Sequence, residues 1–132
     1  MAEDPQVHQY LSALLSETER LLSTLLEGVK GTASMRDHHV YADIEGSRLG
    51  VFTLVLGSEA PEIVYARRYI KLDLIGEGMD AQIEYAQQSL DSIVEFLLSD
   101  RTPAERKSRI FKRPYLSIPM AAADEWKMKK FH

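Results

Sequence analysis

The sequence contains no cysteine and no long apolar run, and both absences exclude classes of protein. Without cysteine the chain has no structural disulfide, thiolate-ligated zinc site, iron–sulfur cluster or cysteine nucleophile. No apolar run approaches the roughly 18 residues that span a bilayer. No early stretch combines the basic, apolar and small-residue regions of a signal peptide. We therefore expect a soluble, cytoplasmic protein.

The sequence also lacks the short motifs that mark common enzyme families. It has no phosphate-binding P-loop, no G-x-G-x-x-G dinucleotide fingerprint and no G-x-S-x-G nucleophile elbow. The carboxylates of Asp80 and Glu84, and those of Asp91 and Glu95, are each one helical turn apart. A catalytic pair needs convergent partners, which the sequence does not indicate. We therefore predict no catalytic residues and no cofactor.

Metal binding is not predicted either, although two histidines and an aspartate are adjacent. Asp37, His38 and His39 follow one another, and neighbouring residues on a strand point to opposite faces of the sheet. A metal site needs three or four convergent ligands. We expect one of these histidines to be packed and the other to be solvated.

Charge is segregated along the chain. Residues 1–99 carry 7 Lys/Arg against 16 Asp/Glu, a balance of −9, and residues 100–132 carry 9 against 4, a balance of +5. An acidic body followed by a basic C-terminal third is typical of a chain whose two parts have different binding partners or bind each other.

Hydrophobic periodicity predicts a helix followed by three strands. Apolar residues recur every three or four positions over residues 5–29, as in an amphipathic helix. After an expected loop over 30–37 the period changes to two, and strands are predicted over 38–45, 49–56 and 63–75. Because short turns join these strands, we expect a three-stranded antiparallel meander.

The remaining elements are two predicted helices and a tail. Residues 80–98 have helical periodicity, and the capping box T-P-A-E begins a short helix over 102–112. The predicted fold class is α+β: an N-terminal amphipathic helix, a three-stranded antiparallel meander, two C-terminal helices and an extended tail. We expect a single domain over 1–113 and an extended basic and aromatic arm over 114–132.

The C-terminal part of the chain is the predicted partner-binding site. Its cations alternate with large apolar side chains, and an extended arm with aromatic anchors loses entropy unless it docks. The arm has three possible binding surfaces: the acidic body of the same chain, a sister subunit, or an external acidic partner. The predicted binding residues are Arg106, Arg109, Lys112, Arg113, Tyr115, Trp126, Lys127, Lys129, Lys130 and Phe131.

An alternative interpretation is nucleic-acid binding. Aromatic rings beside cations suit single-stranded nucleic acid, which binds by stacking and by charge. The basic C-terminal third would supply phosphate contacts, although the acidic body would repel phosphates. The residues of this alternative face are Tyr41, Tyr65, Arg67, Tyr69 and Lys71.

The sequence as a whole indicates a non-enzymatic protein-binding module, such as an adaptor, chaperone or regulator, acting as a homodimer. Its predicted order of elements and acidic body loosely resemble the small dimeric chaperones that serve secreted effectors; the resemblance is architectural and assigns no residues. A third alternative is a small-molecule-binding protein or enzyme with a pocket between sheet and helices, anchored by Arg68.

Overall fold

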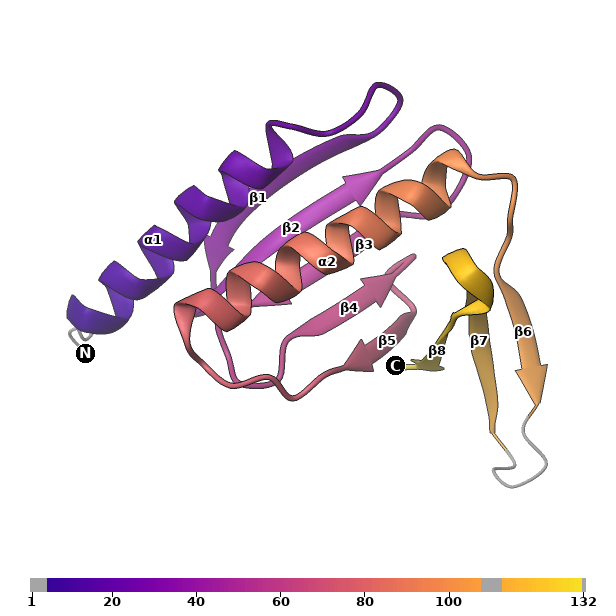
Figure 1. Cartoon of the computed structure of the whole chain (residues 1–132). Coiled ribbons are helices and arrows are strands. Elements are labelled where there is room, and N and C mark those ends of the chain that lie inside the picture. The colour runs from indigo at the N-terminus through magenta and orange to yellow at the C-terminus, as the bar shows by residue number, and fades with distance from the viewer. Residues whose placement is uncertain (1–4, 108–112, 132) are drawn as a thin grey trace.

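Two helices lie on one face of an eight-stranded antiparallel sheet in the computed structural model, which describes residues 5–107 and 113–131 (Figure 1). The helices are α1 (Pro5–Leu22) and α2 (Met79–Leu98). The strands are β1 (Lys30–Arg36), β2 (His39–Glu45), β3 (Phe52–Leu56), β4 (Glu62–Tyr65), β5 (Tyr69–Leu72), β6 (Ala104–Lys107), β7 (Pro114–Pro119) and β8 (Glu125–Lys130). Their order in the sheet is β1-β2-β3-β4-β5-β8-β7-β6, and a short 3₁₀ turn, Ala121–Ala123, joins β7 to β8.

The chain is mixed α+β, but the predicted architecture is wrong. The sheet has eight strands rather than three, and the described residues form two α-helices rather than three. Only the second predicted helix is reproduced closely, as α2. The remaining differences arise at four places along the chain, and each has a local physical cause.

The first helix is shorter than its apolar pattern predicts. Leu11, Leu14 and Leu21 are buried in α1 with the spacing of one helical face. The helix ends at Leu22, and the chain reaches β1 through a loop that includes Gly28, whose φ is 94°. The leucines that continue the pattern beyond residue 22 therefore belong to a loop.

The predicted loop over 30–37 is strand β1, an edge strand that pairs with β2 along its whole length. Two of its helix-facing residues, Gly31 and Ala33, are small, and a Cβ atom at Gly31 would lie 2.8 Å from side-chain atoms of Leu22 and Leu25. Sequence periodicity does not predict this strand, because the close approach of the end of α1 requires a small residue at position 31. Asp37 and His38 form the turn with φ of 48° and 60°, as a two-residue hairpin requires.

The predicted single strand over 63–75 is the hairpin of β4 and β5. Ala66 and Arg67 have φ of 53° and 57° and turn the chain without any glycine, asparagine or proline to mark the position. The position of Tyr65 also differs from the alternative nucleic-acid interpretation, which places this residue on a surface for binding. Tyr65 is buried beneath the helices, its ring centre 4.7 Å from that of Phe52, and Val64 lies on the opposite face.

The predicted C-terminal helix and extended tail are strands β6, β7 and β8. β8 pairs with β5 through Ile70 and Lys129, so these strands extend the same sheet. Leu116, Ile118 and Met128 are buried on the helix-facing side. Strand β7 has the alternation of apolar and polar residues that is typical of a strand. The capping box before it does not begin a helix within residues 102–107, and residues 108–112 of the predicted helix lie outside the described residues.

The core lies between the helices and the sheet. Phe52 of β3 is fully buried and forms an edge contact with Phe96 of α2, with ring centres 5.9 Å apart. Gln82 of α2 is also fully buried. Its amide accepts from the N–H of Gly57 at 3.0 Å and donates to the carbonyls of Ser58 and Gly76 at 2.7 and 2.8 Å. This side chain joins the β3–β4 loop to the segment that enters α2.

Candidate functional site

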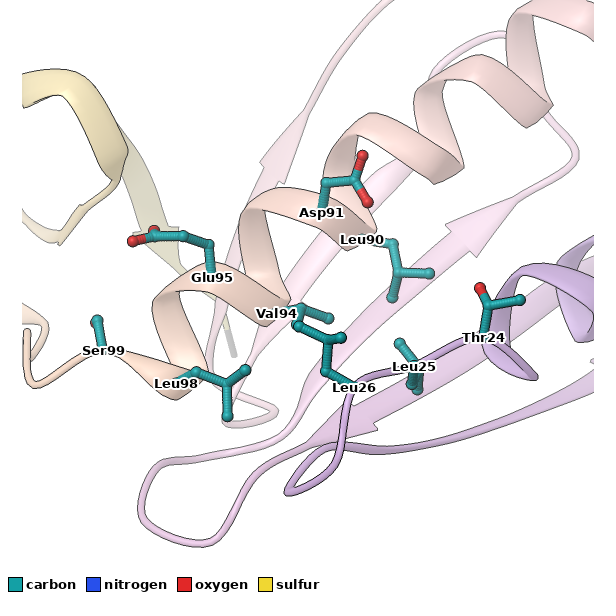
Figure 2. Close-up of a pocket in the computed structure, with 9 residues that line it drawn as sticks. All are labelled: Thr24, Leu25, Leu26, Leu90, Asp91, Val94, Glu95, Leu98 and Ser99. Carbon is teal, nitrogen blue, oxygen red and sulfur yellow. The ribbon is translucent and has the colours of Figure 1, made fainter.

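An apolar groove lies between the end of α1 and the C-terminal half of α2 (Figure 2). Its volume is about 580 Å³. We call it the helix groove, and its lining residues are Thr24, Leu25, Leu26, Leu90, Asp91, Val94, Glu95, Leu98 and Ser99. Leu26 is 60% exposed and Leu98 is 49% exposed. Two large apolar side chains open to solvent in one hollow are a typical feature of a binding surface.

The groove exists because α2 extends past the end of α1 (Figure 1). Along most of the helix layer the two helices are neighbours, but α1 ends at Leu22 while α2 continues to Leu98. Beyond that point the side of α2 that would face α1 has only the loop with Leu25 and Leu26 beside it, while its sheet-facing side stays in the core. The helix layer is therefore incomplete where these leucines are exposed.

The charge around the groove is negative. Helix α2 carries four acidic residues and no lysine or arginine. Two of the acids, Asp91 and Glu95, line the groove. Glu95 forms an ion pair with Arg101, whose Nε also donates to the carbonyl of Pro119 at 2.9 Å. Asp91 is exposed and lies beside the apolar residues.

The end of α2 that forms the groove is held in place by arginine. The guanidinium of Arg48, from the β2–β3 loop, donates to the carbonyl of Ser99 and, at 2.8 Å, to that of Arg101. The N–H of Ser99 donates back to Phe96 at 3.1 Å. These bonds satisfy carbonyls just past the last turn, so the groove has a fixed wall.

A second hollow, of about 390 Å³, lies between α2 and strand β5 and is polar. The carboxylate of Asp73 accepts from the hydroxyl of Tyr85 at 2.7 Å and from the ammonium of Lys71 at 3.0 Å, and Lys71 also lies over the ring of Trp126 at 4.7 Å. Burial, and then the nearby Asp73 carboxylate, raise the pKa of Tyr85. Burial acts to raise the pKa of Asp73, but the two hydrogen bonds outweigh it and hold that pKa below its ordinary value. These charged and polar groups satisfy one another, as in a structural network.

Four of the predicted partner-binding residues lie together on the sheet face away from the helices. Arg106, Tyr115 and Lys129 are in register on β6, β7 and β8, and the ammonium of Lys127 lies 5.7 Å from the centre of the Tyr115 ring. The structure therefore brings cations from both ends of the C-terminal segment to one tyrosine.

The other predicted partner-binding residues are elsewhere. Trp126 and Lys130 lie on the helix-facing side of β8. Arg113 is exposed before β7, and Phe131 follows β8 with its N–H bonded to the carbonyl of Arg68 at 2.9 Å. Arg109 and Lys112 lie outside the described residues.

The residues of the alternative nucleic-acid face do not share one surface. Tyr41 lies on the face away from the helices, where the guanidinium of Arg36 is 4.2 Å from its ring centre. Tyr65 is buried in the core, and Arg67 is in the β4–β5 turn. The two remaining members, Tyr69 and Lys71, are on the helix-facing side of β5.

Within residues 5–107 and 113–131, no three or more His, Asp or Glu side chains are grouped so that they could hold a metal ion. Neither described helix has the length and apolar content required to cross a membrane.

Comparison with protein-family models, curated proteins and solved structures gives no match.

Sequence reasoning missed the helix groove because the predicted first helix continued to residue 29. In that arrangement Leu25 and Leu26 would pack as helical core residues. A signal was present in Gly28, which is typical of a segment leaving a helix, but the apolar repeat continues up to it.

Proposed function

We propose that this chain is a non-enzymatic protein-binding module, an adaptor, chaperone or regulator, whose helix groove holds an amphipathic helix of its partner. The observation that carries the proposal is the exposure of Leu26 and Leu98 beside the buried Leu90 and Val94. A partner helix that lies past the end of α1 would complete the helix layer and cover these side chains.

The charge of the groove selects the chemistry of the partner. Asp91 is exposed beside the apolar hollow, and α2 has no basic residue; Glu95, which also lines the hollow, is paired with Arg101. Complementary potentials favour encounter and discriminate between partners, so the bound helix has lysine or arginine beside its leucine or isoleucine stripe. An acidic helix with the same stripe is disfavoured.

The test uses a fluorescent synthetic helix of about four turns, with leucine on one face and lysine on the flanks. We expect fluorescence anisotropy to detect its binding to the full chain. The double substitution Leu26→Ser and Leu98→Ser should weaken binding about tenfold or more, because truncating buried apolar anchors at an interface costs more than 1 kcal/mol each.

Two controls distinguish specific binding in the groove from nonspecific apolar binding. Leu74→Ser removes another exposed leucine, 79% exposed, which does not line the groove, and should leave binding unchanged. The same peptide with glutamate in place of lysine should bind weakly or not at all. Equal loss of binding in the Leu74→Ser protein, or equal binding of both peptides, would contradict the proposal.

A further inference from the structure

Several strand ends meet at one end of the sheet and bring cations together. The last residues of β8 lie between β7 and the β4–β5 turn (Figure 1). Lys129 of β8 pairs with Tyr115 of β7, and the N–H of Phe131 donates to the carbonyl of Arg68, in that turn, at 2.9 Å. The end of β6 pairs with the start of β7. We call this region the basic end, and its cations are Arg67, Arg68, Arg106, Lys107, Arg113, Lys129 and Lys130.

The segments that form the basic end carry a large excess of positive charge. Residues 66–70, 104–107, 113–116 and 128–131 contain 7 Lys/Arg against 1 Asp/Glu, a balance of +6. The acid is Glu105, which pairs with Leu116 on the helix-facing side. All seven cations are exposed, and none of them belongs to an ion pair within the part of the chain that the structure describes. Because like charges held together repel one another, an anionic partner would stabilise this region.

Aromatic rings lie among these cations. Tyr115 is half-buried, and its register partners on the sheet face away from the helices are Arg106 of β6 and Lys129 of β8. The ammonium of Lys127 lies 5.7 Å from the centre of the same ring. Neighbouring strands are about 4.8 Å apart, so a cation lies one strand away on each side of the tyrosine. Phe131, 38% exposed after β8, is a second ring in this region.

We infer that the basic end binds single-stranded nucleic acid, at a site separate from the helix groove. The arginines and lysines contact backbone phosphates, and unpaired bases stack on Tyr115 and Phe131. The rings favour nucleic acid over an acidic protein segment, because every base has a flat face that can stack on them. A protein segment also needs a groove or pocket for its apolar side chains, and neither hollow described above is lined by a residue of the basic end.

The acidic remainder of the chain does not prevent this binding. The net charge of the chain is −4, but its acids are concentrated in residues 1–99. Exposed charges more than about 8 Å apart are largely screened at physiological ionic strength. The potential that a phosphate meets at the basic end therefore depends on the nearest side chains, which are cations. The acids of α2 repel phosphates from the helix layer and so restrict the nucleic acid to the basic end.

Fluorescence anisotropy of the full chain with a labelled oligothymidylate of about 12 nucleotides tests this inference. Binding should be detectable at low salt, and log affinity against log salt concentration should have a slope of about −2 to −4, as for roughly three to five phosphate contacts. Arg106→Glu with Lys129→Glu should weaken binding about tenfold or more and make the slope shallower. If that protein does not fold, Arg106→Gln with Lys129→Gln gives the same test. Tyr115→Leu should weaken binding about fivefold or more, whereas Tyr115→Phe, which keeps the ring, should bind like the wild type.

The matched control is Lys30→Glu with Arg36→Glu, which changes the net charge equally at exposed sites of β1, at the other edge of the sheet. It should leave binding intact, as should Leu26→Ser with Leu98→Ser in the helix groove. Circular dichroism verifies that each variant is folded. No binding at low salt, an equal loss in the β1 control, or unchanged binding by Tyr115→Leu would overturn the inference. Equal binding of an oligoglutamate or of phosphatidylserine vesicles would also overturn it, in favour of an acidic protein or a membrane surface.

Discussion

Gln82 holds two loops together at the start of α2. Its side chain is fully buried and makes three hydrogen bonds to backbone groups of Gly57, Ser58 and Gly76. Helical periodicity places such a glutamine on a face but does not reveal its partners, because two of them belong to the β3–β4 loop, far from it in the sequence. Its loss leaves partly buried backbone groups without partners.

Gln82→Ala should therefore lower the free energy of unfolding by about 1–3 kcal/mol, the usual cost of leaving a buried polar group unpaired. Chemical denaturation measures this change. Gln88→Ala, at an exposed position of the same helix, is the matched control and should have little effect. Equal losses in the two variants would show that the Gln82 hydrogen bonds contribute nothing.

The Asp73 carboxylate makes stability depend on pH in a defined direction. Its folded pKa lies below its ordinary value, because the hydrogen bonds from Tyr85 and Lys71 outweigh its burial. A lowered folded pKa stabilises the native state above the unfolded pKa, near pH 4, and this contribution is lost as pH falls through the folded value.

Asp73→Asn should therefore lower the melting temperature at neutral pH, and the difference from wild type should shrink as the pH falls below about 4. Thermal melts over a pH series measure it. Asp80→Asn, at an exposed site, should give no such pH-dependent difference. A difference for Asp73→Asn that stays constant from pH 7 to pH 3 contradicts this explanation.

At the scale of elements, sequence periodicity predicts a helix or strand well where one large apolar face is present. Helix α2 is the example, since Leu90, Ile93 and Leu97 repeat without interruption. Strand β1 was missed because Gly31 must be small beneath the end of α1. The C-terminal strands were missed because their pairing with β5 is non-local, and local capping signals cannot report it.

The β4–β5 turn gives an element-scale prediction. Arg67 is exposed and has a φ of 57°, a conformation that costs a non-glycine residue roughly 1–2 kcal/mol. Arg67→Gly should raise the free energy of unfolding by about 0.5–1 kcal/mol, after the larger unfolded-state entropy of glycine is subtracted. Denaturant melts measure it, and Arg68→Gly, one residue on, should destabilise instead. Destabilisation by Arg67→Gly would mean that the turn has another geometry.

At the scale of the whole molecule, the helix groove and the cations of the C-terminal strands lie on opposite sides of the fold. The helix groove is on the helix layer, and Arg106, Lys127 and Lys129 are on the bare face of the sheet, away from the helices. The acidic body and basic C-terminal third read from the sequence become neighbouring regions of one sheet, with Lys129 beside Ile70. Sequence alone gives the segregation of charge, but only strand pairing shows which charges share a face.

Hydrogen–deuterium exchange of the full chain, with and without the leucine–lysine peptide, tests whether the helix groove is where a partner helix binds. The bound peptide should slow exchange in the groove segments, residues 24–29 and 90–99, and leave β6 and β7 unchanged. Protection confined to the bare face of the sheet, or no protection at saturating peptide, would contradict the claim that the helix groove is the binding site.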